Sequence, residues 1–156
     1  MPSTTNALLR QWENVCHWPL GKRLFSFMIG VYIPYTGSIS AKVVELKSGY
    51  ARVQLRERRK VRNHLNSIHA IALANLAEFT GNLAVVAGMP DDARFIVKNF
   101  FIEYLKKARG TLTGECTCEA IESNAKRDVE VKITIKNTDG EIVATAVMQT
   151  LIGPKK

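Results

Sequence analysis

One carboxylate stands out among the residues that could do chemistry, because it lies within a long apolar run. Glu78 is the only acidic or basic side chain besides His69 in the segment HAIALANLAEFTGNLAVV, which spans residues 69–86. A charge in apolar surroundings is costly, so burial would raise the pKa of Glu78 toward the range where a carboxylate acts as a general base. Glu78 is therefore a candidate catalytic residue. The alternative is that it points to the helix edge and meets solvent or an arginine.

Polar residues gather just before this run, at Asn63, His64, Asn66, Ser67 and His69. Such residues at a helix start commonly form the preceding loop or cap the helix. A helix start also leaves backbone N–H groups without acceptors, and these groups can stabilise a developing oxyanion. Asn63 could supply a further donor or position a water. The sequence leaves the structural and the catalytic interpretation of these residues open.

The basic residues are concentrated in two short segments. The chain has a net charge of +8, which favours an anionic partner. The two groups are Arg58, Arg59, Lys60 and Arg62, followed later by Lys106, Lys107 and Arg109. Nucleic acid is not expected, since only Tyr50 offers an aromatic ring near the first group. The alternative to a binding site is a solvated basic surface.

Cysteine and histidine spacing predicts neither disulfides nor a metal site. The three cysteines, Cys16, Cys116 and Cys118, form no spaced framework. Cys116 and Cys118 are two residues apart on a predicted strand, so they share one face and cannot chelate as a Cys-x-x-Cys turn would. The chain starts without a basic region followed by an apolar core, and the stretch 24–35 is too short to span a membrane. These features predict a cytoplasmic protein with no membrane span.

Apolar periodicity predicts the elements that position these residues. Two helices should come first, one capped by Thr4 or Thr5 and running to Trp18, the other over 22–32. Strands should follow at 38–47 and 50–56, then the helix at 69–86, then strands at 94–105, 111–119, 129–136 and 141–151. This order predicts an α+β fold in which an antiparallel sheet of five to six strands curls round one long central helix. We expect a single domain over 1–156, with a helical extension over 1–36 and a core over 38–152. The extension either caps a tunnel or packs outside it.

The spacing of Asn63, His69 and Glu78 resembles the signature of hotdog-fold acyl-CoA thioesterases of the phenylacetyl-CoA type. Those proteins have an Asn, then His-Gly-Gly at the start of the central helix, then Leu-Ala-Asp. The counterparts here are Asn63, the triplet at 69–71 (His-Ala-Ile) and the triplet at 76–78 (Leu-Ala-Glu). The stretch 95–110, FIVKNFFIEYLKKARG, resembles the family's following strand and basic turn. The resemblance covers residues 38–152 and is closest to a thioesterase-like, DUF4442-like branch of the superfamily.

This resemblance implies the hotdog fold and hydrolysis of an acyl-CoA or acyl carrier thioester. The amide of Ala70 would polarise the thioester carbonyl, and Glu78 would activate water or attack as a nucleophile, while Asn63 orients either group. Ala70 and Ile71 replace the paired glycines; Ala70 retains its N–H, but Ile71 is bulkier where the carbonyl lies. Glu78 is one methylene longer than the family's Asp.

The resemblance also implies partners and alternatives. The site would form between subunits of a homodimer or homotetramer. The two basic groups would hold the phosphates of coenzyme A, which is part of the substrate, so no separate cofactor is expected. One alternative is a non-catalytic hotdog protein that binds acyl-CoA. Another is a hotdog dehydratase, for which His69 would have to enter the tunnel as the catalytic histidine.

Overall fold

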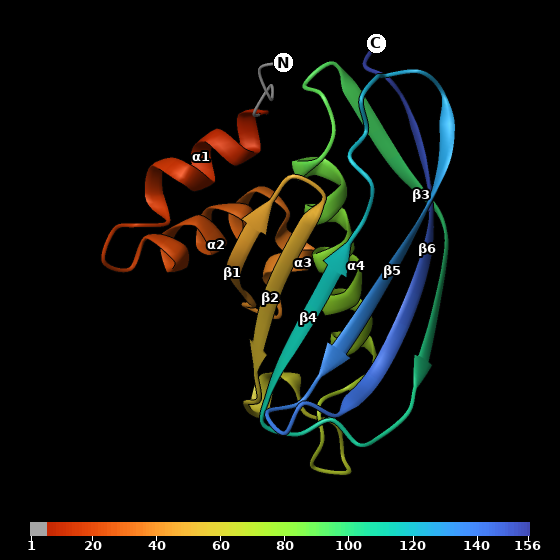
Figure 1. The fold of residues 1–156 in the computed structure, drawn as a ribbon. Coiled ribbons are helices and arrows are strands. Elements are labelled where there is room, and N and C mark those ends of the chain that lie inside the picture. Colours follow the sequence, from red (N-terminus) through yellow and green to blue (C-terminus); the bar gives the residue numbers. More distant parts are fainter. Residues whose placement is uncertain (1–5) are drawn as a thin grey trace.

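The computed structural model describes residues 6–156 as one curled sheet around one long helix. In chain order the elements are α1 (Ala7–Val15), α2 (Gly21–Tyr32), α3 (Pro34–Gly37), β1 (Lys42–Lys47), β2 (Tyr50–Arg56), the 3-10 turn η1 (Arg59–Val61), α4 (Ala70–Ala87), β3 (Ala93–Tyr104), β4 (Thr111–Thr117), β5 (Arg127–Lys136) and β6 (Ile142–Pro154). The six strands are antiparallel and run in the order β1-β2-β4-β5-β6-β3. Figure 1 shows this sheet wrapped round α4, with α1 and α2 beside β1.

The N-terminal helices form a hairpin held by aromatic packing. The side-chain oxygen of Asn6 accepts a hydrogen bond from the Leu9 N–H at 3.0 Å and so caps α1. The predicted caps Thr4 and Thr5 lie outside the described residues, and α1 ends at Val15, three residues before the predicted end. The rings of Trp12 and Phe25 meet edge to face with centroids 5.1 Å apart. Both rings are buried, so the inner faces of α1 and α2 anchor the hairpin.

The strands lie where the alternation predicts them, with one clear difference. β1 begins at Lys42 rather than at Ser38. Residues 34–37 form the short helix α3, and Ser40 has a left-handed φ of 46°, which interrupts an extended chain before Lys42. Ser48 and Gly49 form the tight turn between β1 and β2: Gly49 has a φ of 70°, and a Cβ there would lie 2.4 Å from the Cys118 carbonyl oxygen.

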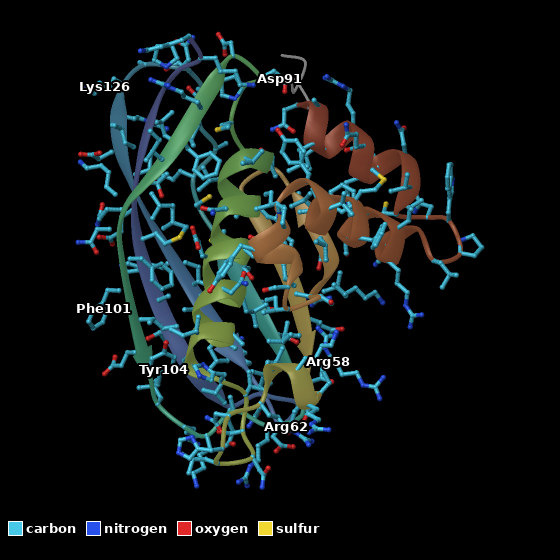
Figure 2. All side chains as sticks on the ribbon, turned by 180° about the vertical axis from the view of Figure 1, so that it is seen from behind. Arg58, Arg62, Asp91, Phe101, Tyr104 and Lys126 are labelled. Carbon is cyan, nitrogen blue, oxygen red and sulfur yellow. The ribbon has the colours of Figure 1, made fainter. Side chains whose placement is uncertain are left out.

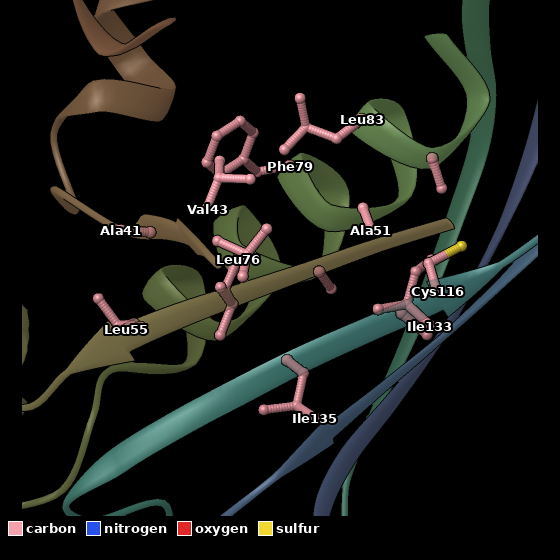
Figure 3. Close-up of a cluster of buried hydrophobic side chains, with 14 of the residues drawn as sticks. Ala41, Val43, Ala51, Leu55, Leu76, Phe79, Leu83, Cys116, Ile133 and Ile135 are labelled. Carbon is pink, nitrogen blue, oxygen red and sulfur yellow. The ribbon is translucent and has the colours of Figure 1, made fainter. Parts of the chain in front are cut away.

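α4 packs its apolar face against the concave side of the sheet (Figure 3). Leu76 is fully buried against β2, β4 and β5, where Ile133 and Ile135 also point inward. Gly81 permits the close approach, because a Cβ there would lie 2.5 Å from Met148 Cε and 3.0 Å from Ile133 Cδ1. By length and composition α4 could cross a membrane, but 67% of its eighteen residues are buried inside the protein, which is typical of a core helix.

A curled antiparallel sheet around one long helix is the hotdog fold, as predicted. The strand order places β3 at one end of the sheet, where it pairs only with β6. The other edge of this twelve-residue strand carries backbone N–H and C=O groups without strand partners. The fold thus has one long edge available for pairing.

Candidate active site

Glu78 lies on the face of α4 that the sheet leaves uncovered. Its side chain is exposed, as is that of Ile71 two helical turns earlier, whereas Leu76 and Ala77 are fully buried. No hydrogen bond or ion pair reaches the Glu78 carboxylate from any other residue in the range 6–156. Of the two interpretations that the sequence left open, the single chain therefore shows the second, in which Glu78 points to the edge of the helix and meets solvent. The alanine-rich sequence of α4 is apolar on nearly every side, as in a helix that is buried all round. A single sheet covers only one side of α4, however, so Glu78 on another side stays exposed.

An apolar groove of about 690 Å³ runs beside Glu78, between α4 and the N-terminal helices. Its apolar walls come from α2, from the residue after it, and from α4: Phe25, Met28, Ile29, Ile33, Phe79, Leu83 and Val86. Glu78 lines the same groove. The N-terminal extension therefore forms one wall of a groove that leads to the candidate catalytic carboxylate.

Asn82 adds a polar group to this groove and was absent from the predicted site residues. It follows Glu78 by one helical turn, so the two side chains lie on the same face of α4. Oδ1 of Asn82 is buried and has no hydrogen-bond partner within the described chain. Leaving a buried acceptor unpaired costs about 1–3 kcal/mol, which favours a donor from a ligand at this place. The four-residue spacing from Glu78 was the signal that could have identified it.

The first turn of α4 leaves the N–H groups of Ala70 and Ala72 without an acceptor in the described chain. His69 caps the helix, and its Nδ1 accepts a hydrogen bond from the Ile71 N–H at 3.1 Å. Ala70 occupies the first helical position, where a helix offers its N–H no internal acceptor, and no residue of the described chain accepts from it. The Ala70 carbonyl accepts from the Tyr104 hydroxyl of β3 at 2.9 Å. Tyr104, which the sequence did not indicate, thus ties the helix start to the sheet, and partial burial raises the pKa of its hydroxyl.

Asn63 shapes the loop that leads into α4. Its Oδ1 accepts hydrogen bonds from the N–H of Leu65 at 2.9 Å, the N–H of Ser67 at 3.2 Å and the Ser67 hydroxyl at 3.1 Å. The loop is held at its end by the His69 N–H, which donates to the Val61 carbonyl at 2.8 Å. Because Oδ1 is occupied, the Nδ2 amide group is the part of Asn63 that could act as a donor toward a ligand.

Glu78 and the Ala70 amide do not meet within one chain. They are eight residues apart on one helix, which corresponds to about 12 Å along its axis. A glutamate side chain cannot bridge that distance to reach a group bound at the helix start. The structure therefore brings together His69, Ala70 and Asn63 at one end of α4 and leaves Glu78 two turns away.

Tertiary contacts bring the two predicted basic groups together around the start of α4. The Arg109 Nε donates to the Asn66 carbonyl at 3.1 Å, and the Ile68 N–H donates to the Ala108 carbonyl at 2.8 Å. Figure 2 shows Arg62 at this end of the molecule, below Tyr104. Four of the predicted cations, Arg58, Arg62, Lys106 and Arg109, have acidic or carbonyl partners. The other three, Arg59, Lys60 and Lys107, have none within the described residues.

Arg58 differs from the rest of its group, because it points away from the α4 start. Its guanidinium donates from Nη2 to the Ile39 carbonyl, while its Nε is buried without a partner in the described part of the chain. It lines a second groove together with Arg23, Lys42 and Arg56. These three cations were not among the predicted binding residues, because they come from α2, β1 and β2 and meet only in the folded chain.

Glu57 connects the two basic groups, and its contacts make the stability of the fold depend on pH. Its carboxylate accepts from the Gly110 N–H and pairs with Arg62 Nε at 2.7 Å. These contacts, the Gly110 bond first, hold the pKa of Glu57 below its ordinary value of 4.5. The stabilisation is therefore present above that value and is lost as the pH falls through the lower folded-state pKa.

We expect Glu57→Gln to lower the free energy of unfolding by about 1 kcal/mol at neutral pH. Because wild-type Glu57 becomes protonated in acid, the difference should shrink at pH values below 4.5. Urea unfolding of both proteins at neutral pH and at about pH 3 measures this change. Glu13→Gln on α1 is the control, since the Glu13 carboxylate is exposed and has no partner in the described chain. An equal difference at the two pH values would contradict the assignment.

The cysteines are free thiols within the described chain. Cys116 is buried beside Cys118, and the hydrogen bond between them together with burial raises the pKa of the Cys116 thiol. Among residues 6–156, no three His, Cys, Asp or Glu side chains gather closely enough to hold a metal ion.

The chain matches one protein family and is similar to several solved structures. The sequence matches the family model "Domain of unknown function (DUF4442)" over residues 21–152. No curated protein matches the chain. Among solved structures, the chain is similar to the crystal structure of the structural-genomics protein APC5556, with a TM-score of 0.82 and 30% identity, covering 95% of this chain and 99% of that one.

Two further solved structures share the fold at lower identity. One is PA5026 from Pseudomonas aeruginosa, named a protein of unknown function and probable thioesterase, with a TM-score of 0.74, 20% identity and coverage of 88% and 97%. The other is a hypothetical thioesterase from Streptococcus pneumoniae TIGR4 with coenzyme A, with a TM-score of 0.67, 16% identity and coverage of 81% and 98%. Since the family model matches most of its length, this chain belongs to the DUF4442 family.

Proposed function

We propose that this protein is a thioesterase that hydrolyses the thioester bond of an acyl-CoA. The observation that carries the proposal is an unpaired carboxylate, Glu78, on the wall of an apolar groove of about 690 Å³. An apolar groove suits an acyl chain, and a carboxylate at its wall suits activation of water. Similar structures named as thioesterases, one with coenzyme A, support the same chemistry.

The site is proposed to form between two copies of the chain. Glu78 and the Ala70 amide are too far apart within one helix to act on the same carbonyl. A two-fold axis beside α4 would place two antiparallel α4 helices together, so that Glu78 of one copy faces Ala70 of the other. The unpaired edge of β3 offers the surface for such an assembly, because antiparallel pairing of two β3 strands would continue the sheet.

In this arrangement the reaction needs only water and the thioester. The Ala70 N–H would donate to the carbonyl oxygen, and Glu78 would take a proton from the water that attacks the carbonyl carbon. The Asn63 amide group would orient the water or the carbonyl. When the carbonyl re-forms, the C–S bond breaks, and the leaving thiolate takes the proton held by Glu78. Direct attack by Glu78, giving an acyl-enzyme anhydride that water then cleaves, is the alternative sequence of steps.

The unpaired cations near the start of α4 suit the phosphate groups of coenzyme A. Arg59, Lys60 and Lys107 have no acidic partners within residues 6–156, and contacts of Arg109 and Ala108 hold the two basic segments side by side. Phosphate groups bind such clusters through charge-assisted hydrogen bonds. The acyl chain would then extend from the helix start into the apolar groove.

A thiol-release assay over acyl-CoAs of increasing chain length tests the proposal. We expect release of coenzyme A, with a rate that rises with chain length until the groove is filled. The same assay with acyl carrier protein thioesters distinguishes the two carriers. No release from any thioester would refute hydrolysis, and acyl-CoA binding by calorimetry in that case would favour the non-catalytic alternative.

A further inference from the structure

α2 has an apolar face that no other part of the described chain covers. Of the sixteen large apolar side chains exposed in the described chain, nine lie within residues 18–35. We call one row of these residues the α2 ridge: Leu20, Leu24, Phe27 and Val31. Their spacing puts them on one side of the helix, and Leu20, Phe27 and Val31 are 69%, 69% and 63% exposed. The opposite side carries the buried Phe25, which anchors α2 to the protein.

A basic groove lies directly beside the ridge. It has a volume of about 670 Å³ and is lined by the cations Arg23, Lys42, Arg56 and Arg58, with no acidic residue on its walls. Arg23, Lys42 and Arg56 have no ion pair within the described residues. Elsewhere on the surface, cations such as Lys98 and Lys106 have carboxylate partners at 3.0 and 2.6 Å. Three unpaired cations therefore meet at this groove, apart from the unpaired cations Arg59, Lys60 and Lys107 at the start of α4.

The ridge and the groove form one continuous surface. Phe27 and Val31 belong to the ridge and also line the groove. Figure 2 shows Arg58 on the side of the molecule where α2 lies. Trp18 and Tyr35, which are 59% and 71% exposed, precede and follow the ridge residues in the chain. Both residue types are enriched where proteins meet the headgroup layer of a membrane.

A second copy of the chain would cover this surface poorly. A two-fold contact through the ridge would set Arg23, Lys42 and Arg56 against the same cations of the other copy, and like charges repel. A soluble anion could enter the groove but would leave the ridge in water. An anionic membrane offers phosphate groups for the cations and an apolar layer for the ridge.

We propose that the α2 ridge and the basic groove bind the surface of an anionic phospholipid membrane. Lipid phosphates occupy the groove beside Arg23 and Lys42, and Phe27 and Val31 insert at the boundary between headgroups and acyl chains. This surface includes neither Glu78 nor Ala70, so the inference is independent of thioester hydrolysis.

Co-sedimentation of the full chain with lipid vesicles tests the proposal. We expect binding to vesicles that contain phosphatidylglycerol, weak binding to pure phosphatidylcholine, and loss of binding as ionic strength rises. Phe27→Ser with Val31→Ser, and separately Arg23→Glu, should each reduce binding at least about tenfold. All three positions are exposed or line an open groove, so thermal unfolding should be unchanged in these variants.

Phe101→Ser and Arg127→Glu are the matched controls. Phe101 is 64% exposed on β3, and Arg127 is an exposed cation of β5 without an ion pair in the described chain. Neither control should change vesicle binding. The proposal is overturned by failure to bind anionic vesicles, or by binding that the ridge and groove variants do not weaken. It is also overturned if those variants change only the oligomeric state in gel filtration, or only the binding of soluble coenzyme A.

Discussion

Replacing Glu78 by glutamine is expected to lower kcat for acyl-CoA hydrolysis by about 10²–10⁴-fold, the usual contribution of a general base. Glutamine has the size and polarity of glutamate but cannot accept the proton from water. Glu78 is exposed and has no partner within residues 6–156, so the substitution should leave the fold and the melting temperature unchanged. The Michaelis constant should change little, because the acyl chain is held by the apolar walls of the groove.

The control for this experiment is Glu122→Gln, which removes another exposed carboxylate without a partner in the described chain. Its rate should equal that of the wild type. Asn82→Ala, one turn from Glu78, should have a smaller effect than Glu78→Gln, because Asn82 positions a ligand and accepts no proton. Equal rates for wild type and Glu78→Gln would show that Glu78 does not activate the water, whatever else binds in the groove.

Ala70→Pro is expected to lower kcat by about 10²–10³-fold, because proline removes the backbone N–H proposed to bind the oxyanion. The local structure should tolerate this change. Proline is favoured at the first position of a helix, and His69 has φ −62° and ψ 140°, a conformation that suits the residue before a proline. Since the Ala70 N–H donates to no residue of the described chain, no structural hydrogen bond is lost. Ala70→Ser keeps the N–H and should retain activity.

Mixing the two inactive variants tests whether the site spans two subunits. A hybrid dimer of Glu78→Gln and Ala70→Pro chains contains one site with both defects and one intact site. After unfolding and refolding together, random pairing should restore about a quarter of wild-type activity. If instead both groups act within one chain, no pairing restores an intact site, and the mixture should stay inactive.

Much of the fold could be predicted from residue patterns. Ala51, Val53 and Leu55 alternate with polar residues, and the structure buries all three on one face of β2. The apolar run at 69–86 became α4, with its limits displaced by one residue. Alternation and helical periodicity are local properties, since each element must present an apolar side to the core. The start of β1 was missed because the left-handed conformation of Ser40 depends on the packing around it.

The candidate site was predictable only in part. The positions of Asn63, His69, Ala70 and Glu78 along the chain were evident in the sequence, whereas Tyr104 and Asn82 emerged from the contacts they make in the folded chain. The sequence left open whether Glu78 is buried or meets solvent, because the side of α4 that stays uncovered depends on where the sheet ends.

By itself the sequence determined the elements, their order and the spacing of the polar residues along α4, because these follow from periodicity within short segments. Only the tertiary structure decided that Glu78 faces an apolar groove rather than the sheet, and that Arg23, Lys42 and Arg56 meet beside an exposed apolar ridge. Such groupings join residues from elements far apart in the chain. They depend on how a curled sheet and its helices fill space together, and no local pattern of residues encodes that.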